Sequence, residues 1–164
     1  MTTQLLFVCL GNICRSPSAE NIMNHLLQAR QLTHHIRCDS AGTSSYHIGS
    51  APDRRMAQAA REQGIVLEGR ARQLQPADLE TFDWILAMDD ENYRDILRLD
   101  PQGRFHHKVR KMCDFCRHHP DTAVPDPYYG GEAGFRYVID LLMDACEGFL
   151  EFLQTQSAPT GGGS

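Results

Sequence analysis

No stretch of this 164-residue sequence is apolar enough over its length to span a bilayer, and the first residues lack the basic segment and apolar core of a secretion signal. Positive charge is also scarce, since 16 lysines and arginines stand against 21 aspartates and glutamates and give a net charge of −5. This charge argues against binding to nucleic acid or to an anionic membrane. We therefore expect a cytoplasmic protein that binds neither, and any anion site must be built locally.

Internal repeats and linkers are also missing from residues 1–155, a length that suffices for one hydrophobic core. Residues 156–164 are rich in Gly and Ser and are predicted to form a flexible tail. Six cysteines without a secretion signal are expected to be free thiols rather than a disulfide framework. We thus expect one domain over residues 1–155.

Apolar runs alternate with helical patterns along the chain. Four segments are predicted as strands: 5–8, 36–40, 84–88 and, more weakly, 108–112. Four helices are predicted, beginning with Ser16 as cap and Pro17 as first residue, at Pro52, at Asp89-Asp90 and near Glu132. This alternation predicts an α/β fold with a parallel sheet, in which ligands bind beyond the carboxyl ends of the strands.

The loop after the first predicted strand has the sequence Cys9-Leu10-Gly11-Asn12-Ile13-Cys14-Arg15-Ser16-Pro17. It joins a buried strand to a helix N-terminus, where backbone N–H groups and the helix dipole favour an anion. Gly11 and Asn12 tolerate the positive φ of a tightly curled loop. Arg15 offers a planar fork that matches two phosphate oxygens. The sequence therefore predicts a phosphate-binding loop.

Cys9 is the candidate nucleophile of this loop. The converging N–H groups, Arg15 and the helix N-terminus all favour a thiolate over a thiol, and the Ser16 hydroxyl can donate to the sulfur. The same N–H groups would meet the equatorial phosphate oxygens as charge develops. The alternative is a buried cysteine that ends a strand beside a surface arginine, and the Ser-Pro pair at the helix start argues against it.

Asp126 is the candidate general acid, because the leaving group of a phosphate ester must be protonated. Prolines on both sides stiffen its backbone. Tyr128 and Tyr129 follow and could wall a pocket for an aromatic leaving group. From its composition alone, such a segment is more commonly a turn that carries a solvated aspartate.

Together these motifs resemble the low-molecular-weight protein-tyrosine phosphatases. The resemblance extends to about residue 155 and includes further landmarks at 39–43, 71–73 and 87–92. It implies a single domain with a four-stranded parallel sheet flanked by helices on both faces. It also implies hydrolysis of phosphotyrosine and aryl phosphate monoesters through a phosphocysteine, with no metal or other cofactor. Phosphotyrosine-containing proteins or small aryl phosphates would be the substrates of a monomeric enzyme, and inorganic phosphate the product.

The resemblance also implies roles for single residues: Cys9 as nucleophile, Arg15 as phosphate clamp and Asp126 as general acid and then base. The rest of the phosphate loop would be Leu10, Gly11, Asn12, Ile13, Cys14 and Ser16. Asn12 and Ser40 would brace it, and four residues would line the mouth: Tyr46, His47, Tyr128 and Tyr129. Gly69 is a departure, because some members carry a His there that supports the loop asparagine.

Three alternatives are weighed against this interpretation. A thiol-dependent arsenate reductase shares the fold, but it needs further cysteines, and 84–92 has none. A zinc module at Cys113 and Cys116 would add His118 and His119, and four ligands within seven residues are too compact for an easy tetrahedron. A phosphate binder without activity is disfavoured because nucleophile, clamp and acid are all present.

Cys14 is predicted to have a redox role. It lies five positions after Cys9 on the same loop, so a curled loop could bring the two sulfurs close together. An accessible Cys9 thiolate would react with peroxide to a sulfenic acid, which Cys14 would resolve as a disulfide. The alternative is that Cys14 only packs beneath the loop.

Overall fold

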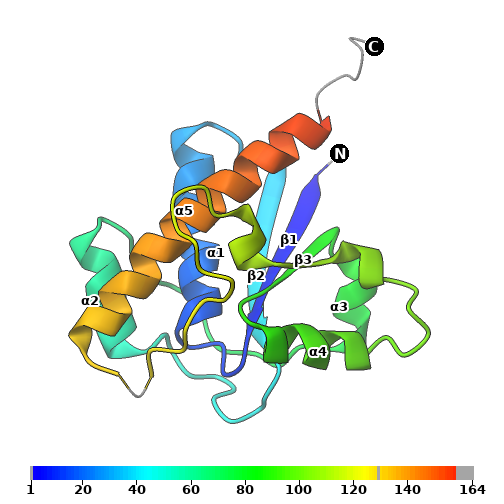
Figure 1. Cartoon of the computed structure of the whole chain (residues 1–164), viewed down its shortest axis with the longest axis horizontal. Helices are drawn as coiled ribbons and strands as arrows, with labels where there is room; N and C mark the ends of the chain where they lie inside the picture. The colour runs from blue at the N-terminus through cyan, green and yellow to red at the C-terminus, as the bar shows by residue number, and fades with distance from the viewer. Residues whose placement is uncertain (1, 129, 158–164) are drawn as a thin grey trace.

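The computed structural model describes residues 2–128 and 130–157. Four parallel strands form one sheet in the order β2-β1-β3-β4 (Figure 1). Their bounds are β1 Thr3–Cys9, β2 Ile36–Gly42, β3 Trp84–Ala87 and β4 Val109–Lys111. The central strands β1 and β3 carry the wholly apolar runs and are buried on both faces. The predicted α/β fold with a four-stranded parallel sheet is confirmed.

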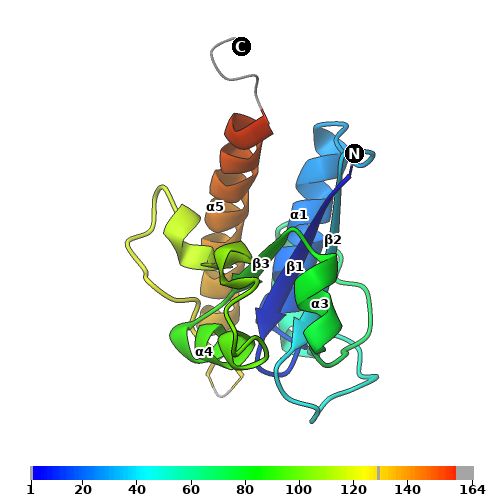
Figure 2. The ribbon, with the colours of Figure 1, turned by 90° about the vertical axis from the view of Figure 1, so that its right-hand side faces the viewer.

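Helices cover both faces of this sheet. Five α-helices are described: α1 Arg15–Ala29, α2 Arg54–Glu62, α3 Pro76–Thr81, α4 Asp90–Arg98 and α5 Glu132–Ser157. Two 3₁₀ turns flank β4, η1 at His106–Lys108 and η2 at Met112–Phe115. Side chains of α1, α2 and α5 share one core cluster with β1, whereas α3 and α4 pack on the opposite face. Figure 2 shows α1 and α5 running side by side.

The helix starts differ from the prediction at two places. Helix α1 begins at Arg15 with Cys14 as its cap, so Ser16 and Pro17 lie inside the first turn. Proline is tolerated there because it has no N–H to lose, and the Ser16 hydroxyl serves the loop instead of capping the helix. Helix α2 is capped by Asp53, whose carboxylate accepts hydrogen bonds from the N–H groups of Arg55 and Met56. Pro52 therefore precedes the cap.

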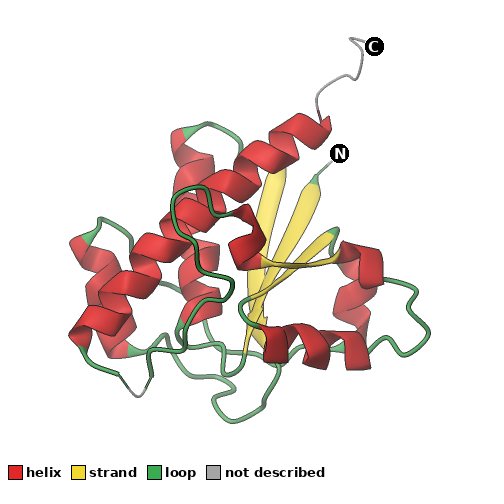
Figure 3. Ribbon diagram, in the orientation of Figure 1, coloured by secondary structure: helices red, strands yellow, loops and turns green. Residues whose placement is uncertain are grey.

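The loops that follow the strands gather at the carboxyl end of the sheet (Figure 3). This edge brings together the loop after β1, the loop after β2, the start of α4 and the segment before α5. None of the helices within residues 2–128 and 130–157 is long and apolar enough to cross a membrane. The first two residues of the predicted tail, 156 and 157, belong instead to α5, and the rest of it, 158–164, lies outside the described residues.

Candidate active site

The loop after β1 curls tightly between β1 and α1. Asn12 supplies the positive φ, 57°, and Gly11 does not adopt one. Gly11 matters because a Cβ there would lie 3.0 Å from the His47 ring. The end of β2 supports the loop from below, where a Cβ on Gly42 would come within 2.7 Å of the Leu10 carbonyl oxygen. Glycine is therefore required at position 42 by close approach of two backbones.

Cys9 lies at the base of this loop, 2% exposed. Its Sγ accepts a hydrogen bond from the Asn12 backbone N–H at 3.2 Å and lies 3.0 Å from the Ser16 Oγ. The Asn12 side chain donates to the same Ser16 oxygen at 2.8 Å. Since that oxygen already accepts, the hydroxyl hydrogen can point at the sulfur, and its other acceptor, the Ala41 carbonyl, lies farther away at 3.5 Å. The arrangement stabilises negative charge on Cys9.

Arg15 is buried with its guanidinium turned toward the other loops. Its Nη1 donates to the Asp89 carboxylate at 2.6 Å and to the Val124 carbonyl at 3.0 Å. Its Nη2 lies 3.6 Å from the Asp126 carboxylate. Burial alone would lower the pKa of Arg15, but the Cys9 sulfur and the Asp89 carboxylate outweigh it and raise the pKa. Arg15 is therefore a fixed cation.

Asp89 is a site residue that the sequence alone marked only as a helix start. One of its oxygens caps α4 by accepting from the Asn92 N–H at 2.7 Å, and the other orients Arg15. A carboxylate in a cap position after a buried strand was visible in the sequence. Its second partner depends on how β1 and β3 pair, which only the fold determines.

Asp126 reaches the site from a segment that crosses over the sheet edge. Val124 anchors this segment, because its side chain is fully buried and its N–H donates to the Met88 carbonyl at 2.8 Å. The Asp126 side chain is 39% exposed and accepts a hydrogen bond from the Tyr128 N–H at 3.1 Å. Arg55 of α2 donates to the Tyr128 carbonyl at 2.9 Å and so ties this segment to α2.

These parts enclose a pocket of about 150 Å³. It is lined by Cys9, Leu10, Gly11, Ile13, Cys14, Arg15, Ser44, Tyr46, His47, Asp126 and Tyr128. Ser44 was not identified from the sequence, and its buried hydroxyl has no hydrogen-bond partner among the described residues. Tyr46 is highly exposed at the mouth, and the rings of His47 and Tyr128 lie 6.1 Å apart. Tyr129 lies outside the described residues.

Asn12, Ser16 and Ser40 lie behind the pocket and support the loop. The Asn12 side chain donates to Ser40 Oγ at 3.0 Å and accepts from the Arg72 N–H at 2.9 Å. Ser40 in turn donates to the Glu20 carboxylate at 2.6 Å. These contacts support Asn12 in place of the histidine that position 69 lacks. Glu20 was missed from the sequence, although it lies one helical turn after Ser16.

The segment Cys113–His119 is held in the fold by hydrogen bonds to α5. Asp144 of α5 accepts hydrogen bonds from the N–H groups of Arg117, His118 and His119, and it lies 2.8 Å from the His119 Nδ1. Across residues 2–128 and 130–157, no three His, Cys, Asp or Glu side chains are placed to hold a metal ion. Within that part of the chain, the predicted zinc alternative has no ligand set.

Comparison with known proteins gives the same picture over nearly the whole chain. The sequence model of the family described as low molecular weight phosphotyrosine protein phosphatase matches residues 4–158. A putative low molecular weight protein-tyrosine-phosphatase of Synechocystis is 59% identical over 150 residues, covering 92% of this chain and 96% of the relative. The Homo sapiens low molecular weight phosphotyrosine protein phosphatase is 38% identical over 150 residues, covering 92% and 95%.

Solved structures agree with the sequence relatives. The Entamoeba histolytica protein tyrosine phosphatase with Hepes in its active site superposes with a TM-score of 0.92 at 46% identity, covering 96% of this chain and all of that one. YfkJ from Bacillus subtilis gives 0.90 at 36% identity, covering 96% and 98%. These matches favour the phosphatase over the arsenate reductase. The chain belongs to the low molecular weight phosphotyrosine protein phosphatase family and is a protein-tyrosine phosphatase.

Proposed function

We propose that this phosphatase hydrolyses phosphotyrosine through a phosphocysteine on Cys9, with Arg15 as phosphate clamp and Asp126 as general acid and base. One observation carries the proposal. Asp126 lies more than a hundred residues after the loop that carries Cys9 and Arg15, yet all three side chains line one small pocket. Nucleophile, cation and proton donor are what an in-line phosphoryl transfer requires.

In the first step the Cys9 thiolate attacks phosphorus and forms the S–P bond. The bond between phosphorus and the tyrosine oxygen breaks, and protonated Asp126 gives its proton to the departing phenoxide. Arg15 and the N–H groups of the loop hold the equatorial oxygens. The loop's own hydrogen bonds to Asn12 and Ser16 keep the sulfur in line with phosphorus.

In the second step water replaces the phenol. The Asp126 carboxylate takes a proton from this water as its oxygen attacks phosphorus, and the S–P bond breaks. Cys9 leaves as a thiolate, which the Asn12 N–H and the Ser16 hydroxyl stabilise. Inorganic phosphate is the product, and the proton taken from water leaves Asp126 protonated and Cys9 ionised, as at the start of the cycle. No step uses a metal or cofactor.

Aromatic esters fit this pocket for a geometric reason. Cys9 lies deep, and the walls above it include Leu10, His47 and Tyr128. A planar phenyl ring can stack between such side chains while its phosphate reaches the sulfur. Phosphotyrosine-containing proteins and small aryl phosphates are therefore the proposed substrates. We also propose a monomeric enzyme in the cytoplasm, with one domain over residues 1–155, supported by the six free cysteines.

The decisive test is Cys9→Ser, assayed with a phosphotyrosine peptide. Turnover should fall to background, because a hydroxyl without an adjacent base stays protonated. Arg15→Lys should also lose most activity, since a point charge cannot make the bidentate contact. Circular dichroism checks that both variants fold. Substantial turnover by Cys9→Ser would sink the phosphocysteine mechanism.

Redox control through Cys14 is part of the proposal. Cys9 and Cys14 line the same pocket, and burial raises the pKa of Cys14, which keeps it a thiol. Peroxide would oxidise the Cys9 thiolate to a sulfenic acid, and the Cys14 thiol would then form a disulfide with loss of water. After peroxide treatment, a dithiol should restore wild type better than Cys14→Ser. Equal recovery would remove Cys14 from any redox role.

A further inference from the structure

Charge is distributed unequally around the mouth of the pocket. On one side, α2 and the start of α5 border a groove of about 870 Å³. Its lining includes four arginines: Arg54, Arg55, Arg61 and Arg136. On the other side, α4 begins with the acidic residues 89–91. Figure 1 shows α2 and α4 on opposite sides of the loops at the carboxyl end of the sheet. A local excess of arginine is notable in a chain with a net charge of −5.

Three of these arginines are not neutralised by a neighbouring carboxylate. Arg54, Arg61 and Arg136 are exposed and form no ion pair with any residue of 2–128 or 130–157. Two carboxylates of the lining, Glu62 and Glu132, are equally unpaired within those ranges. The positive charges therefore exceed the negative ones by one. Natural proteins use arginine where a planar cation must recognise carboxylates or phosphates.

The other lining residues make the groove a firm surface. Arg55 pairs with Asp53, which in turn caps α2, so neither is available to a ligand. The buried side chains of Ala59 and Phe135 form an apolar floor. Arg55 stacks over the Phe135 ring, with 4.7 Å from guanidinium to centroid. The groove thus has a buried apolar base and exposed arginine side chains along its lining.

The groove and the catalytic pocket share a wall. Arg55 lines the groove, and its guanidinium lies 5.3 Å from the ring of Tyr128, which lines the pocket. The Asp53 N–H donates to the carbonyl of Ile13, another pocket residue, at 2.8 Å. The groove therefore lies next to the pocket, within reach of a peptide whose phosphotyrosine enters the pocket.

The length of the groove sets how much peptide it can hold. Helix α2 has nine residues, which corresponds to about 13 Å at the helical rise. An extended chain covers this distance with about four residues. Opposite, Asp90 at the start of α4 forms an ion pair with Lys111 at 2.9 Å, so it adds little repulsion. The groove lies on one side of the mouth, so only one direction of the substrate chain follows its arginines.

We propose that the groove between α2 and α5 binds acidic residues of the protein substrate, over a run of about four positions on one side of the phosphotyrosine. Their carboxylates pair with Arg54, Arg61 and Arg136. This inference rests on the proposed function and names the class of substrate, a phosphotyrosine followed or preceded by an acidic segment. The groove contributes binding rather than chemistry, because its arginines touch none of the reacting groups.

The test compares three substrates on two matched variants. The substrates are phosphotyrosine peptides with Asp and Glu on either side, the same peptides with Asn and Gln, and p-nitrophenyl phosphate. Arg61→Glu/Arg136→Glu reverses charge in the groove. Arg37→Glu/Arg104→Glu makes the same change of net charge at two exposed arginines outside the groove lining. Values of kcat and KM are measured at low and high salt.

Wild type should prefer acidic peptides on one side by about three- to tenfold in kcat/KM, the effect of two or three exposed ion pairs. The preference should appear as a lower KM for the acidic peptides, and it should decrease at high salt. Arg61→Glu/Arg136→Glu should abolish it and leave p-nitrophenyl phosphate turnover unchanged, whereas Arg37→Glu/Arg104→Glu should retain it.

Equal kcat/KM for acidic and amide peptides on both sides would overturn the inference. So would equal loss in the two double variants, which indicates steering by overall charge. The inference would also fail if wild type shows no preference for acidic peptides and is a dimer that only the groove substitutions dissociate. That result would show that a second copy of the chain occupies the groove. None of these outcomes touches the phosphocysteine mechanism, which fails only through the Cys9→Ser assay.

Discussion

Arg15 and Cys9 illustrate how single residues keep charge in a buried site. A buried charge is costly unless it is paired and hydrogen-bonded. Arg15 keeps Asp89 and the Val124 carbonyl as partners, and the Cys9 sulfur keeps the Asn12 N–H and the Ser16 hydroxyl. Both groups therefore have hydrogen-bond partners within the protein itself. Donors and charges held in place by the fold in this way lower the cost of reaching the transition state.

Asp126 has a role that leaving-group chemistry can isolate. Asp126→Asn removes the proton donor but keeps the size and the hydrogen bond from the Tyr128 N–H. The rate should fall by about 10²- to 10⁴-fold for phenyl phosphate. The loss should be smaller for p-nitrophenyl phosphate, whose leaving group needs the proton less. Losses of equal size across a series of substituted phenyl phosphates would show that Asp126 does not act as the acid.

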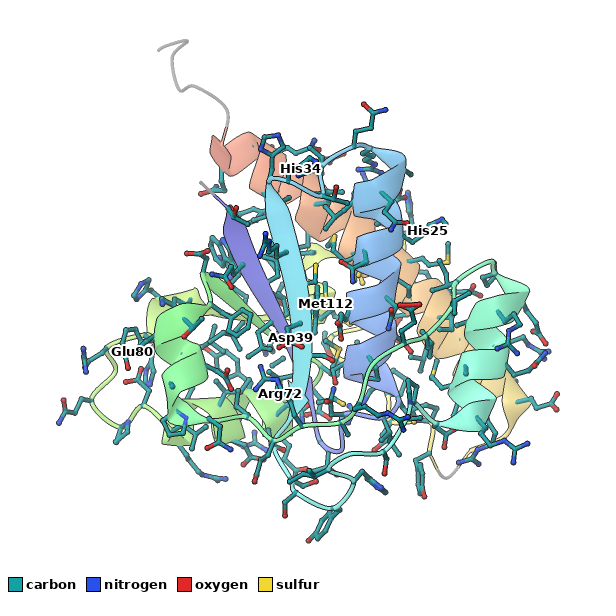
Figure 4. The ribbon with its side chains drawn as sticks, turned by 180° about the vertical axis from the view of Figure 1, so that it is seen from behind. His25, His34, Asp39, Arg72, Glu80 and Met112 are labelled. Carbon is teal, nitrogen blue, oxygen red and sulfur yellow. The ribbon has the colours of Figure 1, made fainter. Side chains whose placement is uncertain are left out.

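Glu20 makes the support of the loop sensitive to pH. Burial raises the pKa of its carboxyl to about 7, although the hydrogen bond from Ser40 lowers this pKa. The charge of Asp39 raises the pKa further, and the charge of Arg72 lowers it. Asp39 and Arg72 lie beside each other near β2 (Figure 4) and form an ion pair at 3.0 Å. The unfolded chain ionises first, near pH 4.5. The free energy of unfolding therefore falls as pH rises from about 4.5 to 7.

Glu20→Gln should remove this loss, because an amide stays neutral and can still accept from Ser40. Relative to wild type, the variant should gain stability between pH 5 and pH 8, by at most about 3 kcal/mol. Urea unfolding at the two pH values measures the gain. Glu80→Gln changes an exposed carboxylate on α3 and serves as the control (Figure 4). If the free energies of unfolding of Glu20→Gln and wild type change equally between the two pH values, Glu20 does not titrate in this range.

At the scale of elements, the predictions succeeded where one local signal dominated. The runs 5–8 and 84–88 are wholly apolar, and both are buried strands. The start of α4 was predicted from Asp89-Asp90, and the start of α5 from Glu132. Helix α3 was not predicted, because six residues are too few for a helical period to show. The start of α1 was misplaced because Ser16 looked like a cap while its hydroxyl serves the sulfur.

Helix α5 contains a glycine whose role only packing reveals. Alanine normally stabilises a helix interior relative to glycine by about 0.5–1 kcal/mol. A Cβ on Gly148 would lie 1.8 Å from the Phe115 carbonyl oxygen, so η2 would have to move. Gly148→Ala should therefore destabilise the protein by at least about 2 kcal/mol.

Gly134→Ala in the same helix is the matched control for Gly148→Ala. The nearest atom to its Cβ is on Pro127 at 4.0 Å, an ordinary contact. This variant should be neutral or more stable by up to about 1 kcal/mol. Urea unfolding of both variants measures the difference. Equal stability of the two would mean that η2 adjusts without cost.

At the scale of the whole molecule, the site divides into a part that sequence could predict and a part that it could not. Cys9, Arg15 and Ser16 lie in one short motif, so their chemistry is readable from spacing. Asp89 and Ser44 join the site only because of sheet order. Glu20 lies one helical turn after Ser16, but its hydrogen bond to Ser40, twenty positions away, depends on how α1 packs on β2. Separations of this size carry no local signal, so these contacts required the fold. The resemblance supplied Ser40 and the mouth residues, which local patterns do not show.

The pocket connects elements across the fold, so an anion bound there should stabilise the whole protein. Inorganic phosphate at about 100 times its Kd should add about 2.7 kcal/mol and raise Tm by roughly 5–10 °C. Arg15→Lys should lose most of this shift, because it cannot hold two oxygens. Asp126→Asn should keep or enlarge it, since a carboxylate 3.6 Å from Arg15 no longer opposes the anion.

Sodium chloride of equal ionic strength controls for screening, and Arg61→Glu/Arg136→Glu controls for phosphate in the groove. A shift lost in the groove variant but kept in Arg15→Lys would place the anion between α2 and α5 instead of in the pocket.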